Sequence, residues 1–398
     1  MTMVSSLELF HGSDVIEHVH SLSFNRTASS TGETEATNYI EHQLVENNIK
    51  PEVEHFNWTG PMRILMRTSY VLLLVYLLLF RMFLIVIAYF VIKNMFEKLR
   101  KITFVNKEQS KNIFTLIPGK QQTTNKPVAI ISAHYDSIST NLPYRLQVVI
   151  FFLYRLIVIF YALIIVIFSF IFLLDYFNII SLTNFIVLLI IFTSIGGVFI
   201  SIPIVYLVFI ERESSGSIDN ASGVAISIEL AKIFNKYPLE NMDVLILWCG
   251  AEEWGMKGSK KFCKKHLNSL AKKYDFTRSF NINIDMVGTY VGLLNKSGLI
   301  IRRKINRNLN DIFKVTADQL KIPLKMHSKA IKPKSDYKMF EKYGKRINSR
   351  FQVSMFHSAR DSKYIHSLRD TPEKCSEENL NGCLNICHQA LRSIDLSY

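Results

Sequence analysis

Cysteine is scarce in this chain, and charge is low for its length. The 398 residues include five cysteines, an odd number without the spacing of a secreted disulfide framework, so we expect reduced thiols. Charged residues make up only 20% of the chain against 49% hydrophobic residues, which excludes a disordered or fibrous protein. The N-terminal region lacks the charged start and apolar core of a signal peptide, so we expect no cleaved leader.

A nucleic-acid-binding motif is also missing, although the chain is basic. Lys and Arg number 47 against 33 Asp and Glu, for a net charge of +14. No recognition helix, zinc-finger spacing or aromatic RNA-binding signature accompanies this charge, so we expect no nucleic-acid partner. Much of the excess instead flanks apolar stretches, which favours an anionic lipid surface. These flanking cations are Arg63, Arg67, Lys93, Lys98, Arg100, Lys101, Arg145 and Arg212.

Three long apolar stretches are present, at Tyr70–Ile92, Val148–Leu174 and Phe185–Ile210. Each is long enough as a helix to cross about 30 Å of hydrocarbon, so the sequence predicts an integral membrane protein with the lipid bilayer as a partner. The cations lie at the ends nearest the rest of the chain, whereas Asp175–Asn184 contains no Lys or Arg. The positive-inside rule then predicts a cytoplasmic catalytic domain.

The first apolar stretch leaves two interpretations open. A single crossing would place the Thr31–Trp58 segment on the opposite side of the membrane from the sheet it should join. Either the stretch is a re-entrant or hairpin helix that breaks near Arg81, where a lipid-facing charge is costly, or the N-terminal segment packs differently. A soluble protein with unusually apolar core helices is the remaining alternative.

Outside these stretches, predicted strands and helices alternate, which favours an α/β fold with a mixed, largely parallel central sheet flanked by helices. The predicted strands are Val53–Trp58, Asn112–Ile117, Pro127–Ala133, Val244–Cys249, Phe280–Asp285, Leu299–Arg302 and Phe351–Met355. The predicted helices are Thr31–Asn48, Ala221–Asn235, Lys257–Lys273, Leu309–Leu320 and Glu377–Leu391.

One domain interrupted twice is the organisation that these elements predict. Residues 1–62, 102–140 and 213–398 form the domain, while residues 63–101 are a first membrane insertion and residues 141–212 a second one with two transmembrane helices.

Acids and histidines recur at the ends of the predicted buried strands. His134 and Asp136 follow one strand and share a face because side chains alternate with period two. Glu252 and Glu253 follow another, where adjacent carboxylates would repel each other unless they hold cations. Asp285 ends a third strand.

Two further positions complete the pattern. Asp219 stands just before a helix, either as an N-cap or as a carboxylate presented to two metals, and His366 is a late histidine. Ligands of open α/β sheets bind at the edge where these residues gather. Histidine and carboxylate donors without thiolates favour zinc, or else manganese or cobalt, in a hydrolytic site.

The ordered motifs resemble those of the co-catalytic di-zinc aminopeptidases, the group that includes aminopeptidase Y, glutamate carboxypeptidase and glutaminyl cyclase-like zinc peptidases. The motifs are Ser132-Ala133-His134-Tyr135-Asp136-Ser137, Asp219-Asn220-Ala221-Ser222-Gly223-Val224, Ala251-Glu252-Glu253-Trp254-Gly255, Asn283-Ile284-Asp285-Met286-Val287-Gly288, Ser335-Asp336-Tyr337 and Ile365-His366-Ser367 before Asp370. The main departure is the long apolar insertion between Asp136 and Asp219, where the family ordinarily has a short loop.

The resemblance implies two zinc ions per chain held by five ligands: Asp219 bridging both, His134 and Asp285 completing one, and Glu253 and His366 completing the other. It further implies that Glu252 is the general base and that Asp136 is the partner that orients His134.

The function expected from this resemblance is that of a membrane-anchored zinc aminopeptidase acting on peptides with a free N-terminus. A glutaminyl cyclase, which has the same fold but uses one zinc, and a non-catalytic membrane receptor or scaffold are the alternatives. The complete ligand set opposes the first alternative, and the presence of Glu252 opposes the second. The sequence predicts neither the preferred substrate residue nor the oligomeric state.

Overall fold

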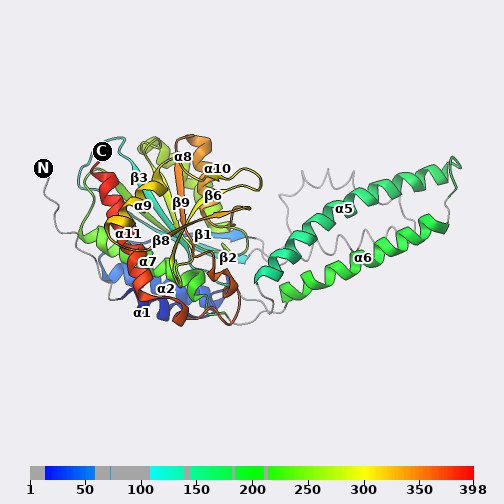
Figure 1. The fold of residues 1–398 in the computed structure, drawn as a ribbon, viewed down its shortest axis with the longest axis horizontal. Helices are drawn as coiled ribbons and strands as arrows, with labels where there is room; N and C mark the ends of the chain where they lie inside the picture. The colour runs from blue at the N-terminus through cyan, green and yellow to red at the C-terminus, as the bar shows by residue number, and fades with distance from the viewer. Residues whose placement is uncertain (1–13, 59–71, 73–107, 139–143, 182–183, 210–213) are drawn as a thin grey trace. The chain divides into compact units, whose positions relative to one another are not determined.

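The computed structural model describes residues 14–58, 72, 108–138, 144–181, 184–209 and 214–398. The chain divides into two compact units (Figure 1). Unit 1 comprises Met1–Trp58, Gln109–Ser139 and Arg212–Tyr398, and unit 2 comprises Thr59–Glu108 and Thr140–Glu211. Apart from Leu72, the predicted insertion at 63–101, with Arg81, lies outside the described residues.

Unit 1 is built on a mixed sheet of nine strands. They are β1 Glu52–Trp58, β2 Glu108–Ile117, β3 Val128–His134, β4 Asp243–Cys249, β5 Phe280–Ile284, β6 Val291–Ser297, β7 Arg303–Lys304, β8 Leu324–Lys329 and β9 Gln352–Phe356. Their order is β1-β2-β4-β3-β5-β9-β6-β7, and β8 pairs with β6. Strands β4, β3, β5 and β9 are parallel, whereas β2 and β6 run antiparallel to their neighbours β4 and β9. The predicted α/β fold with a largely parallel sheet is confirmed.

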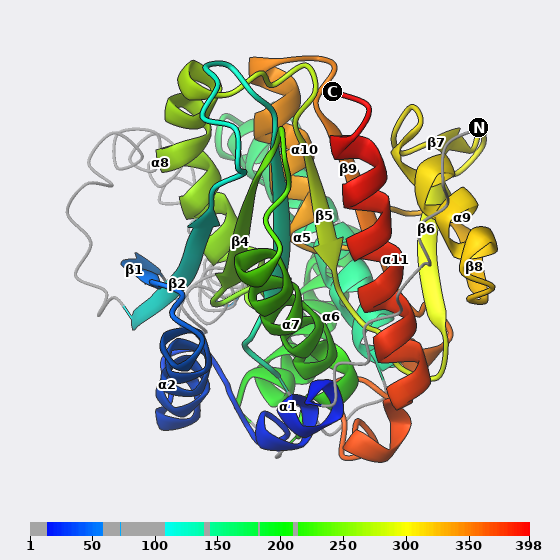
Figure 2. The same cartoon turned by 90° about the vertical axis from the view of Figure 1, so that its left-hand side faces the viewer.

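Helices cover both faces of this sheet. They are α1 Val15–Ser21, α2 Thr31–Glu46, α7 Ser222–Lys236, α8 Lys257–Lys273, α9 Leu309–Gln319, α10 Tyr337–Ile347 and α11 Glu377–Asp395. Helix α7 packs on β3, β4 and β5 and is itself contacted by α1, α2 and α11 (Figure 2). Helix α8 packs against α10.

The core follows from the alternation of side chains along the buried strands. Every residue of β3 and β4 is buried, as expected for parallel strands covered on both faces. On one face, Ile130 of β3 and Leu247 of β4 join a cluster with Phe262 of α8 and Phe340 of α10. The continuous apolar runs of these strands therefore position their carboxyl ends at the rim of a well-packed core.

The predicted strand at Leu299–Arg302 is wrong. Those residues connect β6 to β7, and β6 lies just upstream at Val291–Ser297. Gly298 has φ of 142°, a conformation that residues with a side chain rarely adopt, and it interrupts the extended chain there. Helices α1 and α10 and strand β8 are further elements that the sequence did not predict.

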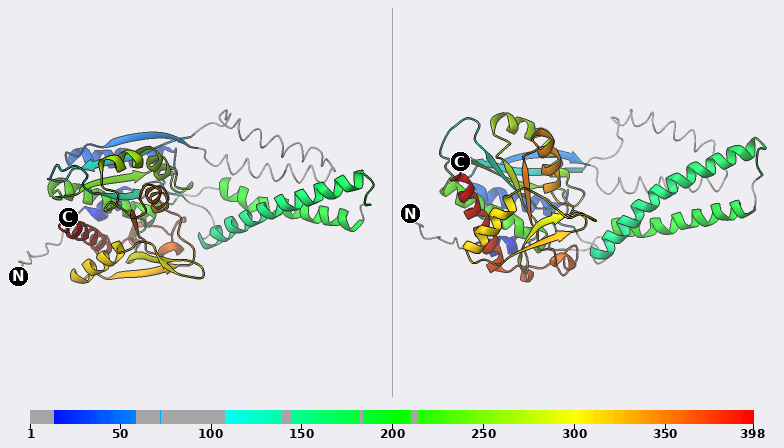
Figure 3. Two further views of the ribbon diagram at one scale, coloured as in Figure 1. Left: turned by 90° about the horizontal axis from the view of Figure 1, so that it is seen from above. Right: turned by 45° about the horizontal axis from the view of Figure 1, so that its top comes forward.

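Unit 2 contains two described helices, α5 Tyr144–Tyr176 and α6 Asn184–Phe209, which contact each other (Figure 3). Asn178, with φ of 55°, lies in the short turn after α5, where Asn is tolerated in the left-handed region. Within the described residues, no helix meets the length and apolarity that a bilayer crossing requires. The two crossings predicted for residues 141–212 are therefore not supported by the described helices.

Candidate metal centre and active site

The ends of three parallel strands bring the predicted site residues together. His134 is the last residue of β3 and lies opposite Cys249, the last residue of β4. Asp285 directly follows β5, and its backbone N–H donates to the carbonyl oxygen of Phe356 in β9 at 3.0 Å. Because β3, β4 and β5 are parallel, the residues that follow them share one edge of the sheet.

A tight turn before α7, residues Ser217–Ala221, presents Asp219 to this edge. Asp370 holds the turn: its carboxylate accepts the N–H of Ile218 at 2.6 Å and that of Asp219 at 3.3 Å. Asn220 attaches the turn to the end of β5, donating to the Ile284 carbonyl at 3.0 Å and accepting from the Met286 N–H at 3.1 Å. Asp219 is therefore fixed from two sides.

Two clusters of metal-ligating groups share Asp219. In the first, His134 Nε2 lies 3.1 Å from Asp219 Oδ1 and 3.7 Å from Asp285 Oδ1. In the second, His366 Nε2 lies 3.3 Å from Asp219 Oδ2 and 3.1 Å from Glu253 Oε2. The two oxygens of Asp219 thus face different histidines, and the donor atoms within each cluster lie within 4.8 Å of one another.

The hydrogen bond that His134 makes through Nδ1 leaves its other ring nitrogen, Nε2, available to a metal. Nδ1 lies 3.0 Å from the backbone carbonyl oxygen of Asp136, which only accepts hydrogen bonds, so Nδ1 carries the proton. The lone pair of Nε2 then points to Asp219 and Asp285. The resemblance implied that Asp136 orients His134. Here the backbone carbonyl of Asp136 does so, because its carboxylate Oδ1 lies 3.7 Å from His134 Nδ1.

The Asp136 carboxylate instead orients the two glutamates. It accepts the backbone N–H of Glu252 at 2.9 Å and that of Glu253 at 3.1 Å. Burial raises the pKa of Asp136 to about 7, although His134 opposes the rise. The segment after β4 is thereby fixed to the segment after β3.

Glu252 is buried at the same edge. Its burial raises the pKa of the carboxyl group well above the usual range, and the nearby carboxylates of Asp336 and Glu253 add to the rise. A buried carboxyl group with a strongly perturbed pKa beside candidate metal ligands is a candidate for proton transfer, the task of a general base.

The donor set fits zinc. Each cluster combines one imidazole with two carboxylates and contains no thiolate, the composition of hydrolytic zinc sites. Glu253 Oε1 is buried without a hydrogen-bond partner among the described residues, as expected of an oxygen that a cation would contact. Burial lowers the pKa of His366, but Glu253 and Asp219 reverse this effect and raise it well above its usual value.

His357, directly after β9, belongs to neither cluster. Its burial lowers the pKa of the imidazole, and the Glu253–His366 pair forms without it.

Arg26 is a site residue that the sequence prediction missed. Its buried guanidinium donates to the carbonyl oxygens of Tyr135 at 2.8 Å, Ser215 at 2.8 Å and Gly216 at 2.9 Å. Burial lowers its pKa to about 10, with Asp370 opposing the shift. It ties the segment after β3 to the turn that carries Asp219. A lone arginine in an irregular N-terminal segment gives no sequence signal of this role.

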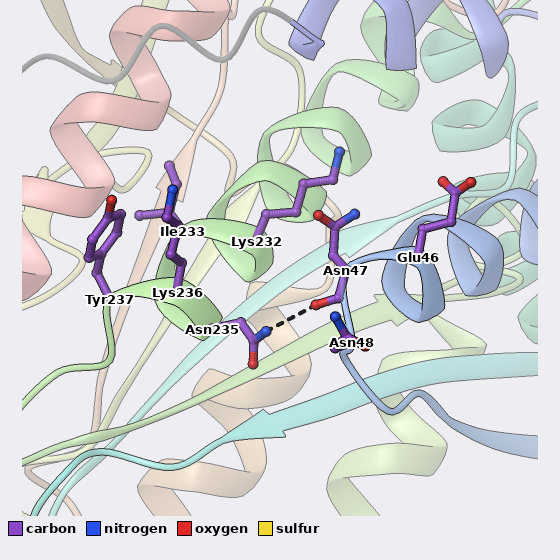
Figure 4. Close-up of a pocket in the computed structure, with 8 residues that line it drawn as sticks. All are labelled: Glu46, Asn47, Asn48, Lys232, Ile233, Asn235, Lys236 and Tyr237. Atoms are coloured by element: carbon purple, nitrogen blue, oxygen red, sulfur yellow. Dashed lines mark hydrogen bonds between the residues drawn. The ribbon is translucent and has the colours of Figure 1, made fainter.

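A separate cavity of about 460 Å³ lies between the ends of α2 and α7 (Figure 4). Asn235 donates to the Asn47 carbonyl oxygen at 3.1 Å across it. None of the predicted site residues lines this cavity.

Residues 201–391 match the sequence model of Peptidase family M28. This region contains Asp219, Glu252, Glu253, Asp285 and His366, whereas His134 lies upstream of it.

Two curated relatives are similar over short stretches. A probable zinc metalloprotease of Pyrenophora tritici-repentis is 35% identical over 78 residues, or 20% of this chain and 17% of the relative. Aminopeptidase YwaD of Bacillus subtilis is 33% identical over 76 residues, or 19% of this chain and 16% of the relative. The chain thus matches about a sixth of the length of these relatives.

Solved structures show the same fold. An aminopeptidase from Aneurinibacillus sp. strain AM-1 has a TM-score of 0.56 at 14% identity, covering 95% of this chain and 92% of its own. A glutaminyl cyclase from an Acidobacteriales bacterium also has a TM-score of 0.56 at 14% identity, covering 100% and 99%. The M28 region at 201–391 therefore lies in a fold shared by zinc aminopeptidases and glutaminyl cyclases.

Proposed function

We propose that this chain is a zinc-dependent aminopeptidase of Peptidase family M28 that hydrolyses the first peptide bond of substrates with a free N-terminus. The sharing of Asp219 between two complete clusters carries the proposal. Its Oδ1 lies 3.1 Å from His134 and its Oδ2 3.3 Å from His366, an arrangement suited to two metals. The family match at 201–391 supports the same conclusion.

Each residue of the site has a distinct task in this reaction. Zinc, when bound by the two clusters, supplies a Lewis acid that polarises the scissile carbonyl and acidifies the attacking water. Glu252 takes the proton from that water and returns it to the leaving amine. Asp136 holds Glu252 in place through its backbone, and Asp370 does the same for Asp219.

A glutaminyl cyclase is the second candidate, because a solved enzyme of that kind is as similar in fold. Only one zinc would then be needed, and the completeness of the His134–Asp219–Asp285 cluster favours the two-metal enzyme. A non-catalytic receptor or scaffold would have no use for a positioned Glu252. Its backbone N–H donates to the Asp136 carboxylate at 2.9 Å.

Purified full-length chain, supplied with zinc, distinguishes these functions. We expect about two zinc ions per chain by elemental analysis, and hydrolysis of aminoacyl substrates but not of the same substrates with a blocked amino group. One zinc together with cyclisation of N-terminal glutamine would establish the cyclase. Absence of both metal and turnover would establish the non-catalytic protein.

We further propose that the α5–α6 pair anchors the protein to a membrane, with the catalytic unit on the cytoplasmic side. Large apolar side chains of both helices are exposed, including Phe160, Phe192 and Phe199, and water is an unfavourable environment for them. Retention of the protein in membrane pellets after alkaline carbonate washing, together with protection of unit 1 from protease in right-side-out vesicles, supports this placement. Release by carbonate contradicts the anchor.

A further inference from the structure

The connection between β6 and β7 exposes three consecutive large apolar residues at the surface of unit 1. Leu299 is 77% exposed, Ile300 92% and Ile301 66%. Such a run is unusual on a soluble surface, where exposed apolar residues are normally scattered singly. We call Leu299–Ile301 the apolar tip.

The base of the tip is well defined. Lys296 pairs with Lys304 and Ser297 with Arg303 across the two strands, and the Ile305 N–H donates to the Asn295 carbonyl at 3.0 Å. The turn needs glycine, since a Cβ on Gly298 would lie 2.0 Å from the carbonyl oxygen of Ile301. The pairing of β6 with β7 therefore fixes the base of the tip.

A fourth exposed apolar residue comes from a neighbouring segment. The Gly298 N–H donates to the carbonyl oxygen of Lys329, the last residue of β8, at 3.2 Å. Two residues further on, Ile331 is 73% exposed. The apolar tip and Ile331 thus start from hydrogen-bonded neighbours, although their segments are far apart in the sequence.

Cations surround this apolar group, and acids are missing from both segments. Residues 296–304 contain four Lys or Arg and no Asp or Glu, and residues 325–334 contain four Lys and no Asp or Glu. Arg302 and Arg303 are exposed directly beside the tip. Some of the outer cations have partners, such as Lys304 with Asp311 at 2.8 Å and Lys332 with Glu341 at 2.8 Å, so the excess positive charge is strongest next to the tip.

We propose that the apolar tip and Ile331 insert into the surface of an anionic lipid bilayer, while Arg302 and Arg303 contact its headgroups. Exposed apolar side chains can enter the hydrocarbon layer of such a bilayer, while the cations beside them contact its negatively charged headgroups. A nucleic acid would use the cations but gives the isoleucines no apolar surface. This contact lies in unit 1 and is independent of both the peptidase reaction and the α5–α6 pair.

The native cysteines make a site-specific test practicable, because all five are buried and free. The full-length Ile300→Cys variant is labelled with an environment-sensitive fluorophore and mixed with vesicles of phosphatidylcholine, alone or with phosphatidylserine. Val45→Cys, on the exposed surface of α2, is the matched control. Nitroxide-bearing lipids in the same vesicles report whether the label reaches the hydrocarbon.

We expect the label at 300 to shift to shorter wavelength and to be quenched by the nitroxide lipids only when phosphatidylserine is present. The label at 45 should not respond. In the Arg302→Glu, Arg303→Glu background the response at 300 should be lost, while unchanged melting of that variant shows that the fold is intact. A label at 300 that stays solvent-exposed overturns the proposal, as does a shift without lipid that rises with protein concentration, since that indicates contact with a second copy. An undiminished response in the charge-reversed variant also overturns it.

Discussion

In the proposed mechanism, single side chains at the sheet edge divide the work between binding metal, moving a proton and holding both groups in position. Glu252 and Glu253 are adjacent in sequence, yet only Glu253 belongs to one of the two candidate metal clusters. Asp136 accepts the backbone N–H of both residues and so fixes the segment from which the two carboxylates project. Neighbouring carboxylates can therefore take different roles.

Replacing Glu252 by Gln tests this division. The amide keeps the volume of the side chain but accepts no proton, so we expect turnover to fall roughly 10²–10⁴-fold while two zinc ions stay bound. Steady-state kinetics and elemental analysis on the same preparation measure both effects. Asp219→Ala is the comparison, because loss of the shared ligand should release metal as well as activity. Normal turnover in the Glu252→Gln variant would remove Glu252 from the reaction.

His388 predicts an acid sensitivity of the fold outside the active site. It is fully buried on α11 with its ring centroid 5.5 Å from that of Phe234, and burial together with Arg392 lowers its pKa to about 4. An unfolded histidine has a pKa of about 6.5, so between these values the unfolded chain binds more protons, and stability falls as the pH falls.

The expected loss from this residue is about 2 kcal/mol of unfolding free energy between pH 7 and pH 5. Urea denaturation of the wild type and of His388→Leu at both pH values measures it, and the variant should lose less stability on acidification. His42→Leu, which removes an exposed histidine of α2, is the control. Equal pH dependence in wild type and His388→Leu would contradict the assignment.

At this scale the sequence was most informative where chemistry constrains the residue type. His134, Asp219, Glu253, Asp285 and His366 could be singled out because acids and imidazoles at strand ends need a reason, and the structure brings them together. The orientation of His134 by a carbonyl rather than a carboxylate could not be predicted, because it depends on the bend of the chain after β3.

At the scale of elements, the site depends on irregular segments more than on strands. Arg26 joins the loop between α1 and α2 to the segments after β3 and before α7 through three carbonyl oxygens. Gly216 has φ of 57°, and a Cβ there would lie 2.6 Å from that of Ser137. These segments therefore meet closely around one guanidinium.

Arg26→Lys should loosen this junction, because one ammonium group cannot reach the positions that the guanidinium fork occupies. Leaving buried carbonyls unpaired should cost about 1–3 kcal/mol of unfolding free energy and weaken zinc binding at Asp219. Thermal denaturation and zinc titration measure the two effects. The control is Arg278→Lys, which keeps a charge near Asp275 at the surface. Wild-type stability and zinc affinity in Arg26→Lys would show that the junction does not depend on the fork.

The elements themselves were predictable where burial or amphipathicity is strong. Residues of β3, β4 and α8 stand where the apolar patterns placed them. The edge of the sheet could not be predicted, because Leu299–Arg302 has the composition of a strand and yet forms an exposed turn. Composition does not tell apolar residues that pack inside from apolar residues that are kept outside, and only the glycine before Leu299 hinted at the difference.

At the scale of the whole molecule, the second unit is joined to the first at points that are close in sequence to residues of the candidate site. Ser139 and Arg212, at the borders of unit 1, lie three residues after Asp136 and seven before Asp219. Because the borders of the two units lie within a few residues of Asp136 and Asp219 in sequence, we expect a membrane anchor in unit 2 to favour membrane-associated peptides as substrates.

Replacing residues 141–211 by a short Gly/Ser loop tests this preference. Unit 1 has its own sheet and core, so we expect the shortened chain to fold, to bind zinc and to hydrolyse soluble peptides at a rate within about tenfold of the full chain. Its preference for a lipidated peptide in vesicles over the same peptide in solution should fall to nearly one. Competition between the two peptides in one reaction measures the ratio, and Glu252→Gln in the shortened chain controls for contaminating peptidases. An unchanged ratio would mean that residues 141–211 do not supply membrane-associated substrate, and the preference would then have to arise in the rest of the chain, where the apolar tip of unit 1 is the surface to alter next.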